Sequence, residues 1–183
     1  SAYRGIMLMP PLETPDFALT DTSGSPFVFA EEAKGAVTMV YFGYTYCANP
    51  CRTQMADLVT EVNSLPEDAG QPVNIVFVTI DPRRDTPERL REWLDRFDPS
   101  IAGVAGDSET IDAAMKEALG SLWRPINSEN ADDGDHAIEH PRFVLAYTPD
   151  GTAHLAYPLD ETEREDWERD LPKLVREKTW GCQ

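Results

Sequence analysis

The chain is poor in basic residues, and this scarcity excludes several kinds of partner. Its 183 residues include 16 lysines and arginines against 33 aspartates and glutamates, which gives a formal net charge of -17. A surface of this sign repels phosphate backbones and anionic lipid head groups. We therefore expect no nucleic-acid partner. A solvated acidic face that serves no particular partner explains the charge as well as a basic partner does.

Long apolar runs are absent as well. The longest run, residues 36–42, contains Thr38 and stops at Gly43, far short of the roughly 20 residues that a membrane-spanning helix needs. We expect this chain to be soluble. Because it starts at Ser1 rather than at methionine, membrane contact is expected only through an anchor or signal segment upstream.

Cysteine is scarce, with only Cys47, Cys51 and Cys182 in the chain. Three cysteines are too few for a small fold held together by disulfides. Two of them are close together, which points to a chemical role for that pair. The third lies near the end of the chain, where we expect it to be a bystander or to pair with another molecule.

Alternating strand and helix patterns predict an α/β fold. A chain of this length is expected to form one domain, residues 1–183, with an extended N-terminal lead over residues 1–16 that packs little because of its prolines. Residues 17–20 and 27–29 predict an N-terminal β-hairpin. Buried central strands are predicted at 36–42, 73–80 and 143–147, the first two as parallel neighbours, and a second strand of a hairpin at 153–157. Helices are predicted at 51–65, from Thr86-Pro87 onward, and at 108–119.

Cys47 and Cys51 follow the first central strand and straddle the start of the next helix. A spacing of four places both side chains on one helical face, so their sulfurs can converge. The free amides at a helix N-terminus favour thiolate over thiol, and thiolate is both a nucleophile and a soft metal ligand. A structural disulfide or a pair of unreactive packed thiols is the plainer alternative.

Two thiolates suit copper(I) or zinc but leave either ion under-coordinated, so a third ligand has to come from elsewhere. Histidine is the natural candidate, and the chain has His136, His140 and His154. His140 precedes the strand at 143–147, which we take as parallel to the first strand, so that its loop lies beside the cysteines. His136 lies in a polar loop four residues earlier, and His154 is expected at the surface of its strand.

The segment Phe42-Gly43-Tyr44-Thr45-Tyr46-Cys47-Ala48-Asn49-Pro50-Cys51 resembles the Sco/SenC family, whose members assemble the binuclear copper site of cytochrome c oxidase. Similar stretches recur in the same order over roughly residues 15–175. They are residues 78–87, residues 101–107, Glu139-His140 and the turn Pro149-Asp150-Gly151.

The resemblance implies a thioredoxin-like fold, with a central mixed β-sheet flanked by helices and the N-terminal β-hairpin as an accessory. It also implies copper, as Cu(I) or Cu(II), bound by Cys47, Cys51 and His140, and a cysteine pair that cycles between dithiol and disulfide. The implied location is extracytoplasmic, periplasmic or on the outer face of the cytoplasmic membrane, with a membrane tether in the full-length protein. The implied partners are the copper-site subunit of the oxidase and another copper chaperone or a thiol-disulfide reductase.

The sequence departs from the family pattern around the proposed ligands. Ala48 and Arg52 stand where the family commonly has proline, and Asn49 stands where an acidic residue is usual. The residue after the histidine is Pro141 instead of a small polar one. The three ligands are intact, so these changes bear on copper affinity, cysteine potential and choice of partner.

Other functions of the same fold compete with this one. A metal-independent thiol-disulfide oxidoreductase would use the cysteine pair alone, although such reductases generally have two residues between the cysteines instead of three. A thiol peroxidase would ordinarily have threonine three residues before the reactive cysteine, where this chain has Tyr44. A binding module would use the cysteines only structurally. We therefore expect chiefly a metallochaperone, with thiol-disulfide reductase activity as an accompanying function.

Overall fold

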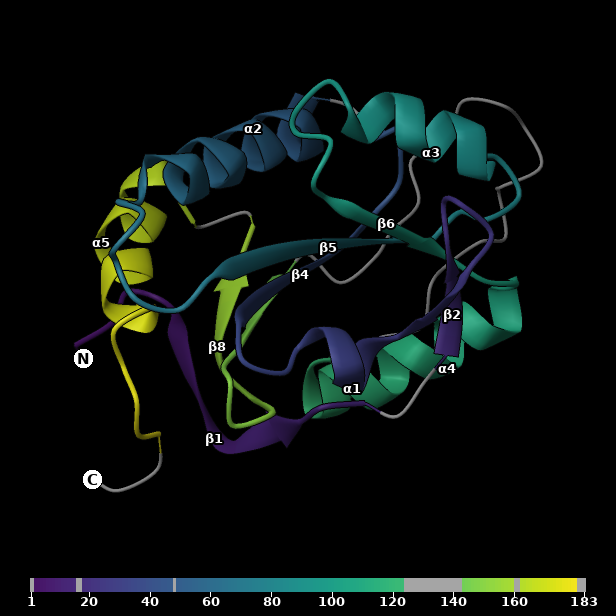
Figure 1. The fold of residues 1–183 in the computed structure, drawn as a ribbon. Helices are drawn as coiled ribbons and strands as arrows, with labels where there is room; N and C mark the ends of the chain where they lie inside the picture. The colour runs from purple at the N-terminus through teal and green to yellow at the C-terminus, as the bar shows by residue number, and fades with distance from the viewer. Residues whose placement is uncertain (1, 16–17, 48, 124–142, 160–161, 181–183) are drawn as a thin grey trace.

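The fold is described by a computed structural model over residues 2–15, 18–47, 49–123, 143–159 and 162–180. Within these ranges the strands form a mixed sheet of eight strands in the order β1-β8-β7-β4-β5-β6-β2-β3, with helices on both faces (Figure 1). The strands are β1 (Ile6–Glu13), β2 (Ala18–Asp21), β3 (Pro26–Val28), β4 (Val37–Gly43), β5 (Val73–Thr79), β6 (Ala102–Ala105), β7 (Phe143–Tyr147) and β8 (Thr152–Pro158). The helices are α1 (Phe29–Glu32), α2 (Asn49–Ser64), α3 (Pro87–Leu94), α4 (Ser108–Leu119) and α5 (Arg164–Leu174), with a short 3-10 turn, η1 (Gly120–Leu122).

Strand β4 is the centre of the sheet, and all of its residues are buried. It pairs in parallel with β5, from Val37 opposite Val73 to Gly43 opposite Thr79. On its other side it pairs with β7. The predicted central strands and the parallel pairing of the first two are therefore confirmed, because continuous apolar runs are typical of strands covered on both faces.

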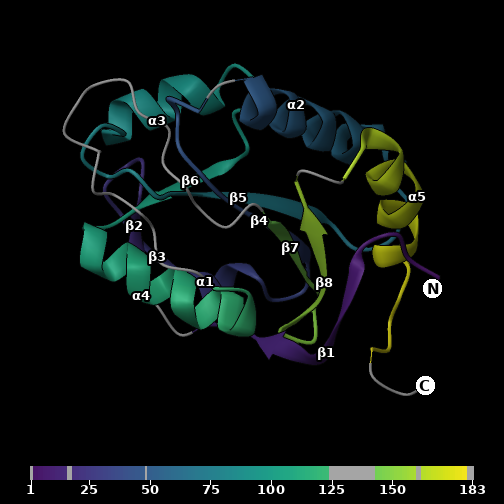
Figure 2. The same cartoon turned by 180° about the vertical axis from the view of Figure 1, so that it is seen from behind.

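Two hydrophobic clusters fill the space between the sheet and its helices. Met39 and Tyr41 of β4 belong to the cluster that α2, α3 and α5 cover, whereas Val40 and Phe42 belong to the cluster that α1 and α4 cover. Successive strand residues point to opposite faces, which divides the strand between the two clusters. Figures 1 and 2 show α2 and α3 on one side of the sheet and α1 and α4 on the other.

The predicted N-terminal hairpin is present, but it continues the main sheet. Strand β2 pairs with β3 on one side and with β6 on the other. Helix α3 begins as predicted after Thr86, whose hydroxyl accepts a hydrogen bond from the backbone N–H of Arg89 at 3.2 Å.

The prediction that residues 1–16 pack little is wrong for most of this segment. Residues Ile6–Glu13 form β1, which pairs antiparallel with β8 from Ile6 opposite Ala156 to Glu13 opposite Thr152. The register shifts between Met7 and Leu12, the stretch that contains the prolines. An edge strand tolerates proline because one side of it makes no ladder hydrogen bonds, so the prolines did not exclude a strand here.

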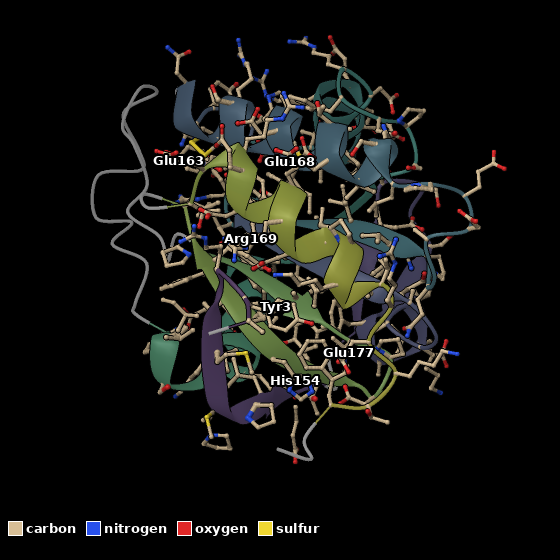
Figure 3. All side chains as sticks on the ribbon, turned by 90° about the vertical axis from the view of Figure 1, so that its left-hand side faces the viewer. Tyr3, His154, Glu163, Glu168, Arg169 and Glu177 are labelled. Atoms are coloured by element: carbon tan, nitrogen blue, oxygen red, sulfur yellow. A yellow bond between two sulfur atoms is a disulfide. The ribbon has the colours of Figure 1, made fainter. Side chains whose placement is uncertain are left out.

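Both terminal segments pack beside α5 (Figure 3). The fully buried carboxylate of Asp170 accepts hydrogen bonds from the backbone amides of Arg4 and Gly5, and from the hydroxyl of Tyr157 at 3.1 Å. The ring of Tyr3 lies 5.5 Å from the ring of Trp180. Figure 3 shows Tyr3, His154 and Glu177 gathered near the C-terminal end of α5.

Candidate metal and redox site

Cys47 and Cys51 are joined by a disulfide at the carboxyl end of β4, with 5.9 Å between their Cα atoms. Cys47 lies in the loop that follows β4, and its backbone N–H donates to the carbonyl of Tyr44 at 3.2 Å. Cys51 lies in the first turn of α2. The strand-loop-helix context therefore brings the two sulfurs within bonding distance.

The two cysteines differ in their exposure. Cys51 is 4% exposed and lies on the buried stripe of α2 that also carries Met55 and Leu58. Cys47 is half-buried and contacts both hydrophobic clusters. An incoming thiolate or metal carrier therefore reaches Cys47 more easily than Cys51.

The start of α2 provides the electrostatic environment of Cys51. Cys51 is the third residue of this helix, and the first amides of a helix have no partner within it. Their partial positive charge stabilises a thiolate in the first turn. When the disulfide opens, Cys51 is the better placed of the two sulfurs to leave as a thiolate.

The direction of β7 differs from the one we assumed. β7 is antiparallel to β4, with Tyr41 opposite Val144 and Thr38 opposite Tyr147. The start of β7 therefore lies at the same end of the sheet as the end of β4, where a parallel β7 would have started at the opposite end. His140 precedes Phe143 by three residues and lies outside the described residues, as do His136 and Cys182.

The expectation that His154 is a surface residue is wrong. The residue is 6% exposed, its ring stacks on Trp180 with 4.7 Å between centroids, and its Nε2 lies 2.7 Å from a carboxylate oxygen of Asp150. It sits next to Ala153, which pairs with Tyr147 at the end of β7 remote from the cysteines. His154 therefore cannot be the third ligand of a site at Cys47 and Cys51.

A buried hydrogen-bond network supports the loop in front of Cys47, and sequence reasoning missed it. Asp85 is 1% exposed, and its carboxylate accepts three hydrogen bonds. Two come from Thr45, from the backbone N–H at 3.0 Å and from the hydroxyl at 2.5 Å, and the third comes from the hydroxyl of Thr79 at 2.7 Å. Arg89 donates from Nε to the Thr45 hydroxyl at 2.9 Å. We call Thr45, Thr79, Asp85 and Arg89 the Asp85 network.

Two guanidinium groups lie over the ring of Tyr46, the residue before Cys47. The guanidinium carbon of Arg89 lies 3.8 Å from the ring centroid and that of Arg84 lies 4.8 Å from it. Arg84 also forms an ion pair with Asp81. Tyr46 is 46% exposed, so this cation-π cluster forms part of the surface beside the disulfide.

The Asp85 network joins residues that are far apart in the chain, and for this reason no local pattern revealed it. Within residues 78–87 the sequence predicts the end of a strand and the helix start at Thr86-Pro87, and the family resemblance alone covers the residues between them. The available signal is the pair Asp81 and Asp85, because acidic residues shortly after a buried strand require partners when they are covered.

No group of three or more His, Cys, Asp or Glu side chains that could hold a metal ion occurs among the described residues. The described part of the site therefore supplies two sulfur ligands at most. In the same part of the chain, no helix has the length and apolar character of a membrane-spanning segment.

The comparisons with known proteins agree on one family. The chain is 30% identical over 150 residues to a SCO2-like protein of Rickettsia felis, covering 82% of this chain and 71% of the relative. It is 29% identical over 184 residues to the mitochondrial protein SCO2 of Saccharomyces cerevisiae, covering 97% of this chain and 58% of the relative. Among solved structures, yeast Sco1 with copper bound superimposes with a TM-score of 0.76 at 26% identity, covering 90% of this chain and 89% of the other.

The structural match shows that the expected thioredoxin-like fold, with its mixed sheet and flanking helices, is correct. The match of the family model is nearly as long as the chain. Because the SCO1/SenC model matches residues 8–176, this chain belongs to the SCO1/SenC family.

Proposed function

We propose that this protein binds copper through Cys47, Cys51 and His140 and serves the assembly of the binuclear copper site of cytochrome c oxidase. One observation carries the proposal: the two sulfurs meet at the end of β4, the end of the sheet at which β7 also starts. His140 is three residues from the start of β7. The copper-bound structure of yeast Sco1, a relative with the same fold, supports copper as the metal.

The chemistry of the ligands fits copper. Thiolate is a soft ligand that selects Cu(I), and imidazole binds both Cu(I) and Cu(II). Reduction of the disulfide would release two thiolates from residues whose Cα atoms lie 5.9 Å apart, close enough to share one ion. His140, three residues before the start of β7, would complete a three-ligand set.

The same cysteine pair can carry out thiol-disulfide exchange with a protein partner. In the dithiol form, the Cys47 thiolate attacks a disulfide of the target, which forms a mixed disulfide and releases one target thiolate. Cys51 then attacks Cys47 Sγ, which closes the Cys47–Cys51 disulfide and releases the second target thiol. The target gains two electrons and two protons, and the protein loses them.

A metal-independent thiol-disulfide oxidoreductase is the second candidate function. The disulfide itself favours it, together with the contrast between half-buried Cys47 and buried Cys51. Such an enzyme needs only the two sulfurs, whereas the copper function also needs His140. The two functions can coexist if reduction of the target's cysteines precedes delivery of copper.

The proposed partners follow from this function. We propose the copper-site subunit of the oxidase as the target, and a copper chaperone or a thiol-disulfide reductase as the source of copper or electrons. The proposed location is extracytoplasmic, by periplasmic residence or by tethering to the outer face of the membrane. The yeast relative SCO2, a mitochondrial protein, supports a location outside the cytosol.

The test is a titration of the reduced protein with Cu(I) against a competing chelator. We expect one copper per chain in the dithiol form and none at these two sulfurs in the disulfide form. Cys47→Ser and Cys51→Ser should each abolish binding. If the reduced wild-type protein fails to compete with the chelator but still reduces a disulfide substrate, the second candidate is correct.

A further inference from the structure

We infer that the Asp85 network, together with the stack of Arg89 on Tyr46, is a positioning device that holds Cys47 ready to pair with Cys51. It sets how readily the dithiol closes to the disulfide. By the same means it sets how tightly the two thiolates hold one metal ion, and this second part rests on the copper function proposed above.

Thr45 is fixed on two sides. Its backbone N–H and its hydroxyl both donate to the carboxylate of Asp85, which is buried behind the loop. Its hydroxyl oxygen accepts a hydrogen bond from Arg89 on the outer side. Hydrogen bonds to a charged group are stronger than those between neutral groups, so the backbone two residues before Cys47 has little freedom.

Tyr46 is fixed by the same arginine. Arg89 places its guanidinium over the ring at 3.8 Å while its Nε reaches Thr45. Arg89 belongs to the first turn of α3, whose buried residues Leu90 and Trp93 anchor that helix in the core. The loop before Cys47 is thus attached to a rigid element, although Tyr46 itself is exposed.

This attachment matters because closing a disulfide or sharing one metal ion requires both sulfurs in one place. Cys51 belongs to the first turn of α2, so more of the conformational freedom belongs to Cys47 and the residues before it. Ordering a residue costs conformational entropy. The network removes that cost before the two sulfurs meet, which raises their effective concentration for each other.

The positive charge of Arg89 has the opposite effect on the redox balance. A nearby cation stabilises thiolate and so favours the dithiol form. A variant that loses Arg89 changes both the charge near the cysteines and the position of the loop before Cys47. Thr45→Val changes only the position of the loop, because it removes the Thr45 hydroxyl without altering any charge. Thr45→Ser keeps a hydroxyl at this position.

The experiment measures the equilibrium constant for oxidation of the Cys47–Cys51 dithiol in buffers of reduced and oxidised glutathione. In this reaction two protein thiols and one oxidised glutathione give the disulfide and two reduced glutathiones. We expect the constant to fall about tenfold in Thr45→Val, which corresponds to about 30 mV for this two-electron couple. Thr45→Ser should remain close to the wild type.

Arg91→Gln is the matched control for charge on α3. Arg91 donates hydrogen bonds to Asp95 and to the carbonyl of Ile101 instead of to the Asp85 network, so its loss should leave the equilibrium constant unchanged. Arg89→Lys keeps the charge but loses the planar group and the Nε donor. It should lower the constant about threefold, and it carries the test if Thr45→Val does not fold.

An unchanged constant in Thr45→Val or in Arg89→Lys, with only a lower melting temperature, would overturn the inference and leave the network a purely structural feature. The glutathione measurement does not involve copper. A wild-type protein that binds no copper would therefore refute the proposed function while the effect of Thr45→Val on the dithiol could still be read.

Discussion

The buried carboxylate of Asp170 in α5 accepts the backbone N–H of Gly5 at 2.9 Å, across 165 residues of chain. It also accepts the N–H of Arg4 at 2.8 Å and the hydroxyl of Tyr157 at 3.1 Å. These hydrogen bonds replace the contacts with water that the carboxylate loses because it is fully buried. The contact explains why the segment before β1 is fixed against the last helix.

Replacing Asp170 by alanine should destabilise the protein strongly. Two backbone amides and one phenol would lose a charged acceptor inside the protein, and such losses cost about 3 kcal/mol or more. Urea unfolding followed by far-UV circular dichroism measures the change. Glu168→Ala, at an exposed position of the same helix, should stay within about 0.5 kcal/mol of the wild type. Equal stabilities of the two variants would show that Asp170 does not anchor the N-terminal segment.

Stability should fall at alkaline pH because of Tyr3 and Tyr157. Burial, followed by the charges of Glu177 and Asp170, raises the pKa of Tyr3 to about 12. Burial and then Asp170 raise the pKa of Tyr157 well above its ordinary value. Unfolded tyrosines ionise near pH 10, so the folded state binds more protons above that pH. The contribution is complete below about pH 10 and is lost as the pH rises toward 12.

The measurement combines absorbance at 295 nm, which follows tyrosinate, with urea midpoints at several pH values between 9 and 11. Tyr3→Phe should decline less steeply with pH than the wild type over this range. A wild-type protein whose six tyrosines all ionise together near pH 10 while it remains folded would contradict the prediction.

His140→Ala should separate the copper function from thiol exchange alone. Cu(II) bound by two thiolates and an imidazole gives strong sulfur-to-copper absorption, and loss of the imidazole leaves an incomplete ligand set. We expect the variant to lose that absorption and to bind Cu(I) more weakly, while it still forms the disulfide. His136→Ala serves as the control in the same segment. If His140→Ala binds copper normally but loses reductase activity, the metal assignment is wrong.

Cys182→Ser should leave the copper stoichiometry unchanged. A ligand near a chain end must be ordered at an entropic cost that a pair already joined by its fold avoids. Metal analysis after gel filtration of the copper-loaded variant and wild type measures the ratio. Loss of one copper equivalent in the variant would assign Cys182 a ligand role.

The strands that carry the site could be predicted because their apolar runs are continuous and local. The position of Cys47 and Cys51 after β4 follows from such a run and from the helical pattern after it. Strand β1 could not be predicted in this way because its prolines resemble an unpaired lead, and its pairing with β8 joins the two ends of the chain.

Two other features depended on contacts between distant residues. The burial of His154 comes from Trp180, which lies beyond the last helix. The Asp85 network joins Thr45 to Asp85 across 40 residues and adds Arg89 from a separate helix. Charge and periodicity report how each segment packs on average, but they do not identify which polar side chains meet.

Cys47 contacts the hydrophobic clusters on both faces of the sheet, and this has a consequence for how the molecule can be observed. We expect the opening or closing of the disulfide at this sulfur to alter the packing on both sides of β4 at once. Native-state hydrogen exchange reports the free energy of local opening amide by amide. Amides of α2 and of α4, on opposite faces of the sheet, should therefore change their exchange rates together when the cysteines are oxidised or reduced. Their exchange rates would then report the redox state of the cysteine pair.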